Sequence, residues 1–314
     1  MSVSINPSVS LRSKTENIVA QNRKREKIAF GVLRSVLCLV VLGVFALLGF
    51  IFVRGIGKLN WAFLSTSSNA DASGGIFPQL LGTYYLIVGT ILIALPLGIA
   101  GAIYLSEYAG HSPLVRLIRL AIVNLAGVPS IVHGLFGLGF FVLFVGGSID
   151  RFILHTQTPV WGQPCMLWGF CTLAVVILPL IITATEEALL SVPRSFREAS
   201  LGMGATKWQT IWNVVLPTAL PGILTGAILG IGRAAGETAP VMLTCAASFK
   251  PTLPVAYNDQ TLLLPYHLYY VVTQVPNSTT ETQSGIAMVL ILMVFSINII
   301  AVIVRTKMRR ARKW

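Results

Sequence analysis

Two opposite charges, Arg233 and Glu237, interrupt the otherwise uncharged apolar segment Pro217–Ala246. Residues four apart lie on one face of a helix, so these side chains can form an ion pair. A guanidinium offers paired N–H donors that match a tetrahedral oxyanion, and a carboxylate can accept a hydrogen bond from a protonated oxyanion. Two interpretations stay open: an anion site, or an internal ion pair that meets no ligand.

A second feature is the polar segment 198–217, EASLGMGATKWQTIWNVVLP, which stands between two apolar runs. Its composition favours helix, with Gly204 in its middle. Most connections between neighbouring helices need only a few residues. A polar connection of this length is therefore expected to be ordered and held against something.

The composition is that of a polytopic membrane protein. Of 314 residues, 54% are apolar and only 11% charged, whereas soluble domains are about 25% charged. The mean hydropathy is +0.77. The net charge of +12 does not indicate nucleic-acid binding, because seven of the 23 Lys and Arg residues precede residue 35 and six follow residue 304. Such clusters flank membrane spans on the cytoplasmic side.

The histidines and cysteines form no pattern typical of a metal site. The four histidines are more than twenty residues apart, and no CxxC pair occurs. We therefore expect neither a metal nor a cofactor. Cys165 and Cys171 could form a disulfide, but their spacing alone does not decide this.

Six apolar segments are long enough to cross a bilayer, which takes about 20 residues, so we predict an all-α membrane protein. Gly127 and Pro129 interrupt the third, which indicates either a kink beside a transport pathway or a packing kink. In the fifth, Gly222, Gly226 and Gly230 predict a face for close helix packing. The expected spans are Ile28–Val53, Leu80–Leu105, Leu120–Val145, Met166–Thr185, Pro217–Ala246 and Gly285–Val304.

The distribution of positive charge predicts the orientation of these spans. With the N-terminus inside, eighteen of the 23 Lys and Arg residues lie in inner segments and four in outer segments. This asymmetry predicts that both termini are cytoplasmic and that residues 186–216 face the cytoplasm. We expect residues 1–27 to form a basic tail that does not fold on its own, and residues 305–314 to form a second basic tail.

The polar segment resembles the EAA loop of ABC-transporter permeases, with Ser200 in place of the third alanine and Val214 in place of an isoleucine. Together with GRAAGETAP at 232–240, it resembles the permeases of the high-affinity phosphate importer. The stretches at 74–109 and 124–142 resemble the A-type (PstA) subunit, although His133 stands where a tyrosine is expected.

This resemblance implies a type I ABC importer permease in the plasma membrane, with residues 28–53 as a first transmembrane helix and residues 80–304 as the permease domain. It implies three kinds of partner: a C-type permease, a dimer of cytoplasmic ATP-binding subunits, and an extracytoplasmic phosphate-binding protein. The chain itself contains no GxxxxGK[ST] loop, so we expect it to bind no nucleotide and catalyse no reaction. The residues expected to couple to the ATPase are Glu198, Ala199, Gly204, Leu216 and Pro217, and those expected to line the substrate pathway are Arg233, Glu237, Asn124 and Ser130.

Three alternatives remain. The chain could be an ABC permease for another oxyanion or small solute. It could be an ion-coupled secondary transporter, although this leaves the long polar segment without a role. An intramembrane enzyme would require paired Asp, Ser–Lys or HExxH within the spans, and the expected spans contain none of these.

Overall fold

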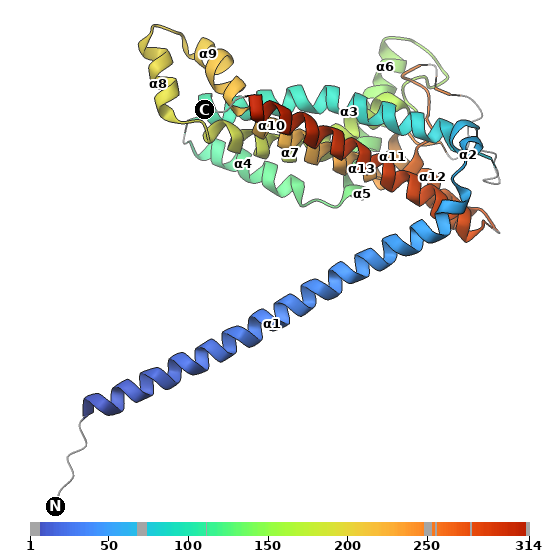
Figure 1. Ribbon diagram of the computed structural model, residues 1–314. Coiled ribbons are helices and arrows are strands. Elements are labelled where there is room, and N and C mark those ends of the chain that lie inside the picture. The colour runs from blue at the N-terminus through green and yellow to red at the C-terminus, as the bar shows by residue number, and fades with distance from the viewer. Residues whose placement is uncertain are drawn as a thin grey trace, which may run out of the picture. The chain divides into compact units, whose positions relative to one another are not determined.

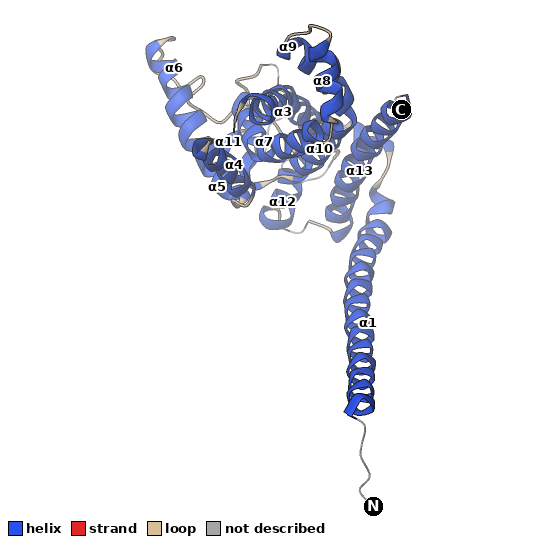
Figure 2. Ribbon diagram, turned by 90° about the vertical axis from the view of Figure 1, so that its left-hand side faces the viewer, coloured by secondary structure: helices blue, strands red, loops and turns tan. Residues whose placement is uncertain are grey.

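The structure is a computed structural model that describes residues 7–67, 74–110, 112–247, 253–254, 256–276 and 278–311. The regular elements among these residues are helices (Figure 2), and one isolated bridge joins Ala246 to Thr261. The predicted all-α fold class is confirmed. The chain divides into two compact units, Met1–Arg54 and Gly55–Trp314.

The first unit is formed by the helix α1 (Pro7–Gly55), whose most apolar stretch has no buried residue. The helix starts at Pro7, so residues 7–27, which we expected not to fold on their own, extend it toward the N-terminus. Lys, Arg, Gln and Glu are good helix formers. Extending a helix that the apolar part has already nucleated is far easier than starting one.

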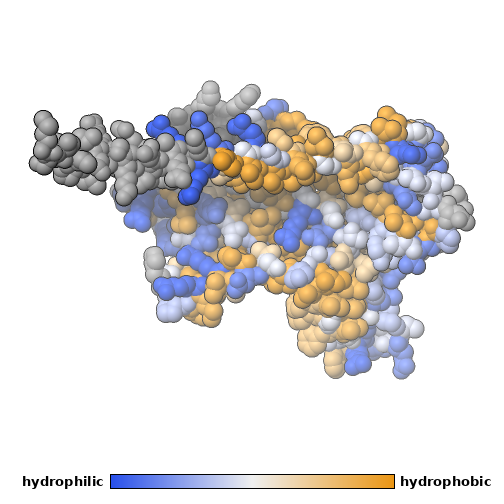
Figure 3. All heavy atoms as spheres, turned by 90° about the horizontal axis from the view of Figure 1, so that it is seen from below, coloured by the Kyte–Doolittle hydropathy of each residue, from blue (hydrophilic) through white to orange (hydrophobic). Residues whose placement is uncertain are grey.

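Among the described residues, six helical segments are long and apolar enough to cross a membrane, in agreement with the predicted number. Apolar side chains also cover large parts of the surface (Figure 3), as expected for a chain whose solvent is lipid. Within the second unit, the helices α8 and α9 project from one end, close to the C-terminal end of α13, whereas α2, α6 and α12 lie at the other (Figure 1). The six segments are Arg25–Lys58, Phe77–Tyr108, Ser130–Phe152, Met166–Leu190, Lys207–Gly236 and Thr280–Lys307.

The core of the second unit is α7 (Met166–Leu190), the most buried of the six candidate spans. It packs against α3 (Phe77–Ile103) and α10 (Leu216–Gly236). The contacts with α10 are so close that a Cβ atom added at Gly222 would lie 2.5 Å from the Ala188 Cβ, and one added at Gly226 would lie 2.6 Å from the Ala184 Cβ. The predicted glycine packing face is confirmed, since only glycine fits at these positions.

The third span differs from the prediction of one broken helix over Leu120–Val145. The chain forms a separate helix α4 (Pro113–Ala126), and the candidate span begins only at Ser130. The span comprises α5 (Ser130–Phe136), the π-helical η3 (Gly137–Gly146) and α6 (Gly147–Phe152). The division follows from Pro129, which has no N–H to donate and disfavours helical backbone at the residue before it.

The fifth span ends earlier than predicted. We expected it to reach Ala246, but α10 ends at Gly236 and Glu237 has extended backbone. A short helix α11 (Ala239–Thr244) follows. In a continuous helix the ring of Pro240 would clash with the Gly236 carbonyl, so the chain breaks between them.

The remaining elements lie between and after these spans. Asp150 accepts hydrogen bonds from the backbone N–H groups of Val160, Trp161 and Gly162 at 2.7–3.1 Å, which orders the loop before α7. Cys165 and Cys171, whose pairing the sequence left open, are free thiols. The other elements of the second unit are η1 (Ile56–Lys58), α2 (Trp61–Ser65), α12 (Leu264–Gln274) and α13 (Thr280–Ala311).

We predict that Gly226→Ala lowers the stability of the folded protein by about 1–3 kcal/mol, because the new methyl group forces α7 and α10 apart. Gly236→Ala is the matched control, since a Cβ atom there meets nothing within 4 Å. Thermal unfolding in detergent, followed by size-exclusion chromatography, measures both. Equal midpoints for the two variants would contradict the close packing.

We also predict a pH dependence from His267 on α12, outside the six candidate spans. Burial lowers the pKa of this imidazole to about 4 from its ordinary value of 6.5. Between these values the unfolded chain binds the proton more readily. Stability is therefore complete above about pH 6.5 and falls by up to about 3 kcal/mol as the pH drops toward 4.

Replacing the buried imidazole should flatten this dependence. We expect His267→Gln to show a smaller loss of thermal stability between pH 7 and pH 4.5 than the parent protein. His155→Asn is the control, because His155 is exposed and asparagine tolerates its positive φ of 51°. A parent protein whose unfolding midpoint does not change over this pH range would refute the assignment.

Candidate functional site

The predicted ion pair forms where α10 ends. The Nε atom of Arg233 lies 3.3 Å from Oε1 of Glu237. The arginine side chain is 34% exposed and that of the glutamate 15%. Among the described residues, the two terminal nitrogens of the guanidinium have no hydrogen-bond partner. The fork that would bind an oxyanion is therefore free, while the pair already lowers the net charge of the site.

The packing of α10 against α7 determines how far along α7 the ion pair Arg233–Glu237 lies. Gly222 faces Ala188 near one end of α7, and Gly230 faces Ile177 and Ile181 near its middle. Because the two helices run antiparallel, Arg233 lies at about the mid-height of α7. Irregular backbone at membrane depth is tolerated where it is buried in protein or lines a cavity. The break after Gly236 thus coincides with the charges.

The two other predicted pathway residues, Ser130 and Asn124, lie on α5 and α4 rather than on α10. Ser130 is the first residue of α5, which packs against α11, so that a Cβ atom at Gly134 would lie 2.9 Å from the Pro240 Cα. The second half of α5, about one turn from Ser130, is thus close to the segment that follows the ion pair. Asn124 is exposed on α4, and in the described part of the chain neither Asn124 nor Ser130 hydrogen-bonds to Arg233 or Glu237.

The polar segment folds into two helices, α8 (Arg194–Gly202) and α9 (Lys207–Thr210). Gly204 makes the turn between them with φ +89°, a backbone conformation that favours glycine. The Ser200 hydroxyl lies 2.9 Å from that of Thr210, and both are buried. The serine that departs from the EAA pattern therefore closes the two helices onto each other.

The outer side of this two-helix loop is exposed and partly apolar. Glu198 and Ala199 are exposed on α8. Met203 is 86% exposed, and Trp208 stacks on Trp212 with a centroid distance of 5.7 Å. Exposed apolar side chains on an otherwise polar loop are typical of a protein-docking surface.

Leu216 and Pro217, which we expected to couple to the ATPase, lie inside a continuous helical segment. The π-helical η4 (Ile211–Val215) follows α9 directly and continues into α10, so the helical segment is unbroken from Lys207 to Gly236. Pro217 lies at the second position of α10, where its missing N–H falls beside the π-helical turn. Both residues are half-buried. They belong to the long helical segment that follows the loop rather than to the exposed surface of the loop.

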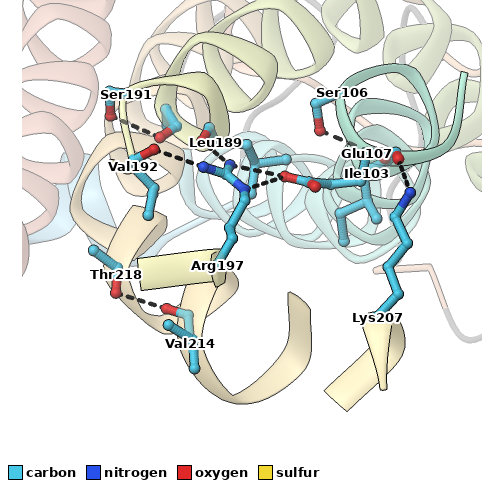
Figure 4. Close-up of polar contacts among 11 residues, drawn as sticks. Ile103, Ser106, Glu107, Leu189, Ser191, Val192, Arg197, Lys207, Val214 and Thr218 are labelled. Atoms are coloured by element: carbon cyan, nitrogen blue, oxygen red, sulfur yellow. Dashed lines mark hydrogen bonds and ion pairs between the residues drawn. The ribbon is translucent and has the colours of Figure 1, made fainter. Parts of the chain in front are cut away.

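A carboxylate that the sequence did not single out joins this loop to α3 (Figure 4). Glu107 lies in η2 (Tyr104–Tyr108), a π-helical turn that ends α3. Its Oε1 atom accepts a hydrogen bond from Arg197 Nη2 on α8 at 2.8 Å. Its backbone carbonyl accepts one from Lys207 Nζ on α9, and the same ammonium group lies 4.7 Å from the centroid of the Tyr108 ring.

Two arginines, Arg197 and Arg119, join the ends of neighbouring helices near this loop. Arg197 also donates to the carbonyl oxygens of Leu189 at 2.8 Å and Val192 at 2.6 Å, at the end of α7. Arg119 on α4 pairs with Glu186 on α7 at 2.8 Å and donates to the Leu105 carbonyl at 2.8 Å. From the sequence, these arginines served only as evidence of orientation. A signal for Glu107 did exist, since it is the only acidic residue in 74–109.

The described residues contain no cluster of three His, Cys, Asp or Glu side chains that could hold a metal ion. The polar contacts around the two-helix loop and at the end of α10 are ion pairs and hydrogen bonds. Such an arrangement can bind an anion and transmit movement.

Comparison with known sequences agrees with this geometry. Residues 94–313 match the family described as binding-protein-dependent transport system inner membrane component. The chain is 34% identical over 298 residues to the probable ABC transporter permease protein YqgI of Bacillus subtilis, which covers 89% of this chain and 95% of YqgI. It is 33% identical over 241 residues to the phosphate transport system permease protein PstA 1 of Mycobacterium tuberculosis, with 77% and 73% covered.

Solved structures show the same fold at low identity. A bacterial ABC transporter involved in alginate import gives a TM-score of 0.66 at 14% identity, covering 94% of this chain and 99% of that one. The MetNI methionine ABC transporter in an inward-facing conformation gives 0.54 at 19% identity, covering 74% and 97%. The predicted importer permease fold is confirmed. The chain therefore belongs to the family of binding-protein-dependent transport system inner membrane components.

Proposed function

We propose that this chain is the A-type permease subunit of an ATP-driven importer of inorganic phosphate in the plasma membrane. The observation that carries the proposal is that one unbroken helical segment, Lys207–Gly236, has the exposed loop at one end and Arg233 near the other. A push on the loop from a cytoplasmic ATPase therefore has a continuous helical path to the segment that holds the proposed anion-binding group. Both termini lie in the cytoplasm in this proposal, as the positive charges predict.

The proposal includes three kinds of partner. A C-type permease completes the pathway around Arg233, whose guanidinium is partly exposed in the single chain. Two ATP-binding subunits supply the hydrolysis, and one of them holds the α8–α9 loop through Glu198 and its apolar neighbours. An extracytoplasmic phosphate-binding protein delivers the substrate to the opposite end. Alternating access then moves packed helices around a site near the membrane midplane.

Phosphate is favoured as the substrate by two observations. One is the similarity to PstA 1, whose name states phosphate transport. The other is the pairing of a free guanidinium fork with a carboxylate, because hydrogen phosphate can donate a hydrogen bond to Glu237 whereas sulfate cannot. The alternative is an ABC importer of another oxyanion or small solute, since the name of the similar YqgI states no substrate.

We predict that Arg233→Ala abolishes phosphate uptake while the complex with its partners still assembles. Arg233→Lys should retain the charge but lose the planar fork, and uptake should fall at least about tenfold. Radiolabelled phosphate uptake in cells lacking their own importer measures this, with membrane levels of each variant checked by immunoblot. Excess unlabelled phosphate should suppress the signal, whereas excess sulfate should not.

The control for this experiment is Arg151→Ala, which removes an exposed arginine away from the ion pair. Full uptake by Arg233→Ala would return the ion pair to a structural role. Equal competition by sulfate would replace the phosphate assignment with that of a general oxyanion importer.

We further predict that Glu198→Ala weakens binding of the ATP-binding subunit at least about fivefold, the effect of losing about 1 kcal/mol at an interface. Glu281→Ala is the matched control, because Glu281 is also exposed but begins α13 at the opposite end of the second unit. Affinity purification of the complex, with quantification of the retained ATPase, checks the result. Equal retention by both variants would remove Glu198 from the docking surface.

A further inference from the structure

The end of α3 is shaped so that one residue faces the two-helix loop. The last turn of α3 widens into the π-helical turn η2, in which the Ala109 N–H bonds to the Tyr104 carbonyl at 2.7 Å. Such turns shift the direction in which the following side chains point, and they recur at functional positions. Here the turn places Glu107 against α8 and α9 (Figure 4).

This one residue is held by both helices of the loop. Arg197 on α8 contacts its carboxylate through Nε at 3.3 Å and Nη2 at 2.8 Å. Lys207 on α9 contacts its backbone carbonyl. The glutamate side chain is only 10% exposed and that of Arg197 19%. A pair shielded to this extent is weakened less by water and salt than a surface pair, so it can hold a fixed geometry.

Apart from Glu107, Arg197 bonds to the carbonyls of Leu189 and Val192, which lie beside the point where the loop begins. The first end of the loop passes through Ser191–Pro193, and its second end passes through the π-helical η4. Both are places where a chain bends more easily than in a regular α-helix. A force applied to α8 could therefore bend these joints instead of moving the bundle, unless a further contact fixes the angle of the loop. The ion pair Arg197–Glu107 is a contact of this kind, because it joins α8 to the π-helical turn that ends α3.

We propose that Glu107 is a positioning residue for energy coupling: it fixes the two-helix loop to the end of α3, so that movement of the loop becomes movement of the helix bundle. This inference rests on the proposed function, because it assumes that an ATPase moves the loop. Loss of the Glu107 carboxylate leaves the docking surface around Glu198 intact, since that surface lies on the exposed side of α8. ATP hydrolysis should thus continue while less solute moves per ATP.

The test uses the complete transporter, with both permeases, the ATPase and the binding protein, reconstituted in proteoliposomes. Phosphate uptake and ATP hydrolysis are measured in the same vesicles for the parent, Glu107→Ala and Glu107→Gln. We expect Glu107→Ala to reduce the phosphate moved per ATP hydrolysed at least about fivefold, the lower end of typical coupling effects. Glu107→Gln keeps the shape of the side chain and should show a smaller reduction.

The matched control is Glu187→Ala. Glu187 is an exposed glutamate in the last turn of α7 and forms no ion pair in the described structure, so its removal should leave the ratio unchanged. An unchanged ratio for both Glu107 variants would overturn the inference. So would dissociation of the ATPase in both variants, because Glu107 would then serve assembly rather than coupling.

Failure of the proposed function would look different. If the parent transporter hydrolyses ATP and moves another solute but no phosphate, the phosphate assignment is wrong. The ratio for Glu107→Ala is then measured with that solute, and a reduction would still support the role of Glu107.

Discussion

Close packing of α7 between α3 and α10 is the constraint on which the rest of the second unit depends. In a membrane, lipid is as apolar as the helices, so association relies on van der Waals contact and hydrogen bonds rather than on the hydrophobic effect. Glycines opposite Ala184 and Ala188 bring the α10 backbone against α7, and Gly98 brings α3 to within contact of Ile181. These contacts determine the height of Arg233 and the direction in which the loop projects.

The charges at the end of the bundle that carries α8 and α9 have two roles in the same molecule. Arg119 and Arg197 contribute to the positive asymmetry that predicts orientation, and each also joins a carboxylate to backbone carbonyls at a helix end. Terminal carbonyls lack partners within their own helix. Arginine suits this position because its five donors can reach a carboxylate and several carbonyls together.

Much of the fold followed from local sequence features, and much of the site did not. Six apolar runs predicted six spans, and a separation of four residues predicted the ion pair Arg233–Glu237. The break between Gly236 and Pro240 was not predicted. Proline is tolerated within many membrane helices, so a proline alone does not predict where such a helix ends. The pair Arg197–Glu107 joins residues ninety positions apart. No periodicity encodes such a contact, which exists only once α3 and α7 are packed side by side.

The partial exposure of Arg233 makes the isolated chain costly to hold in a bilayer. A charge near the middle of a bilayer costs about 2.5–3.5 kcal/mol on insertion scales, and Glu237 shields only one edge of the guanidinium. A copy made without a companion chain leaves the other edge toward lipid or a water defect. In the proposed assembly, a companion chain covers this edge and removes the exposure. The charge proposed to bind the transported anion would thus also favour synthesis of the two permease chains in matched amounts.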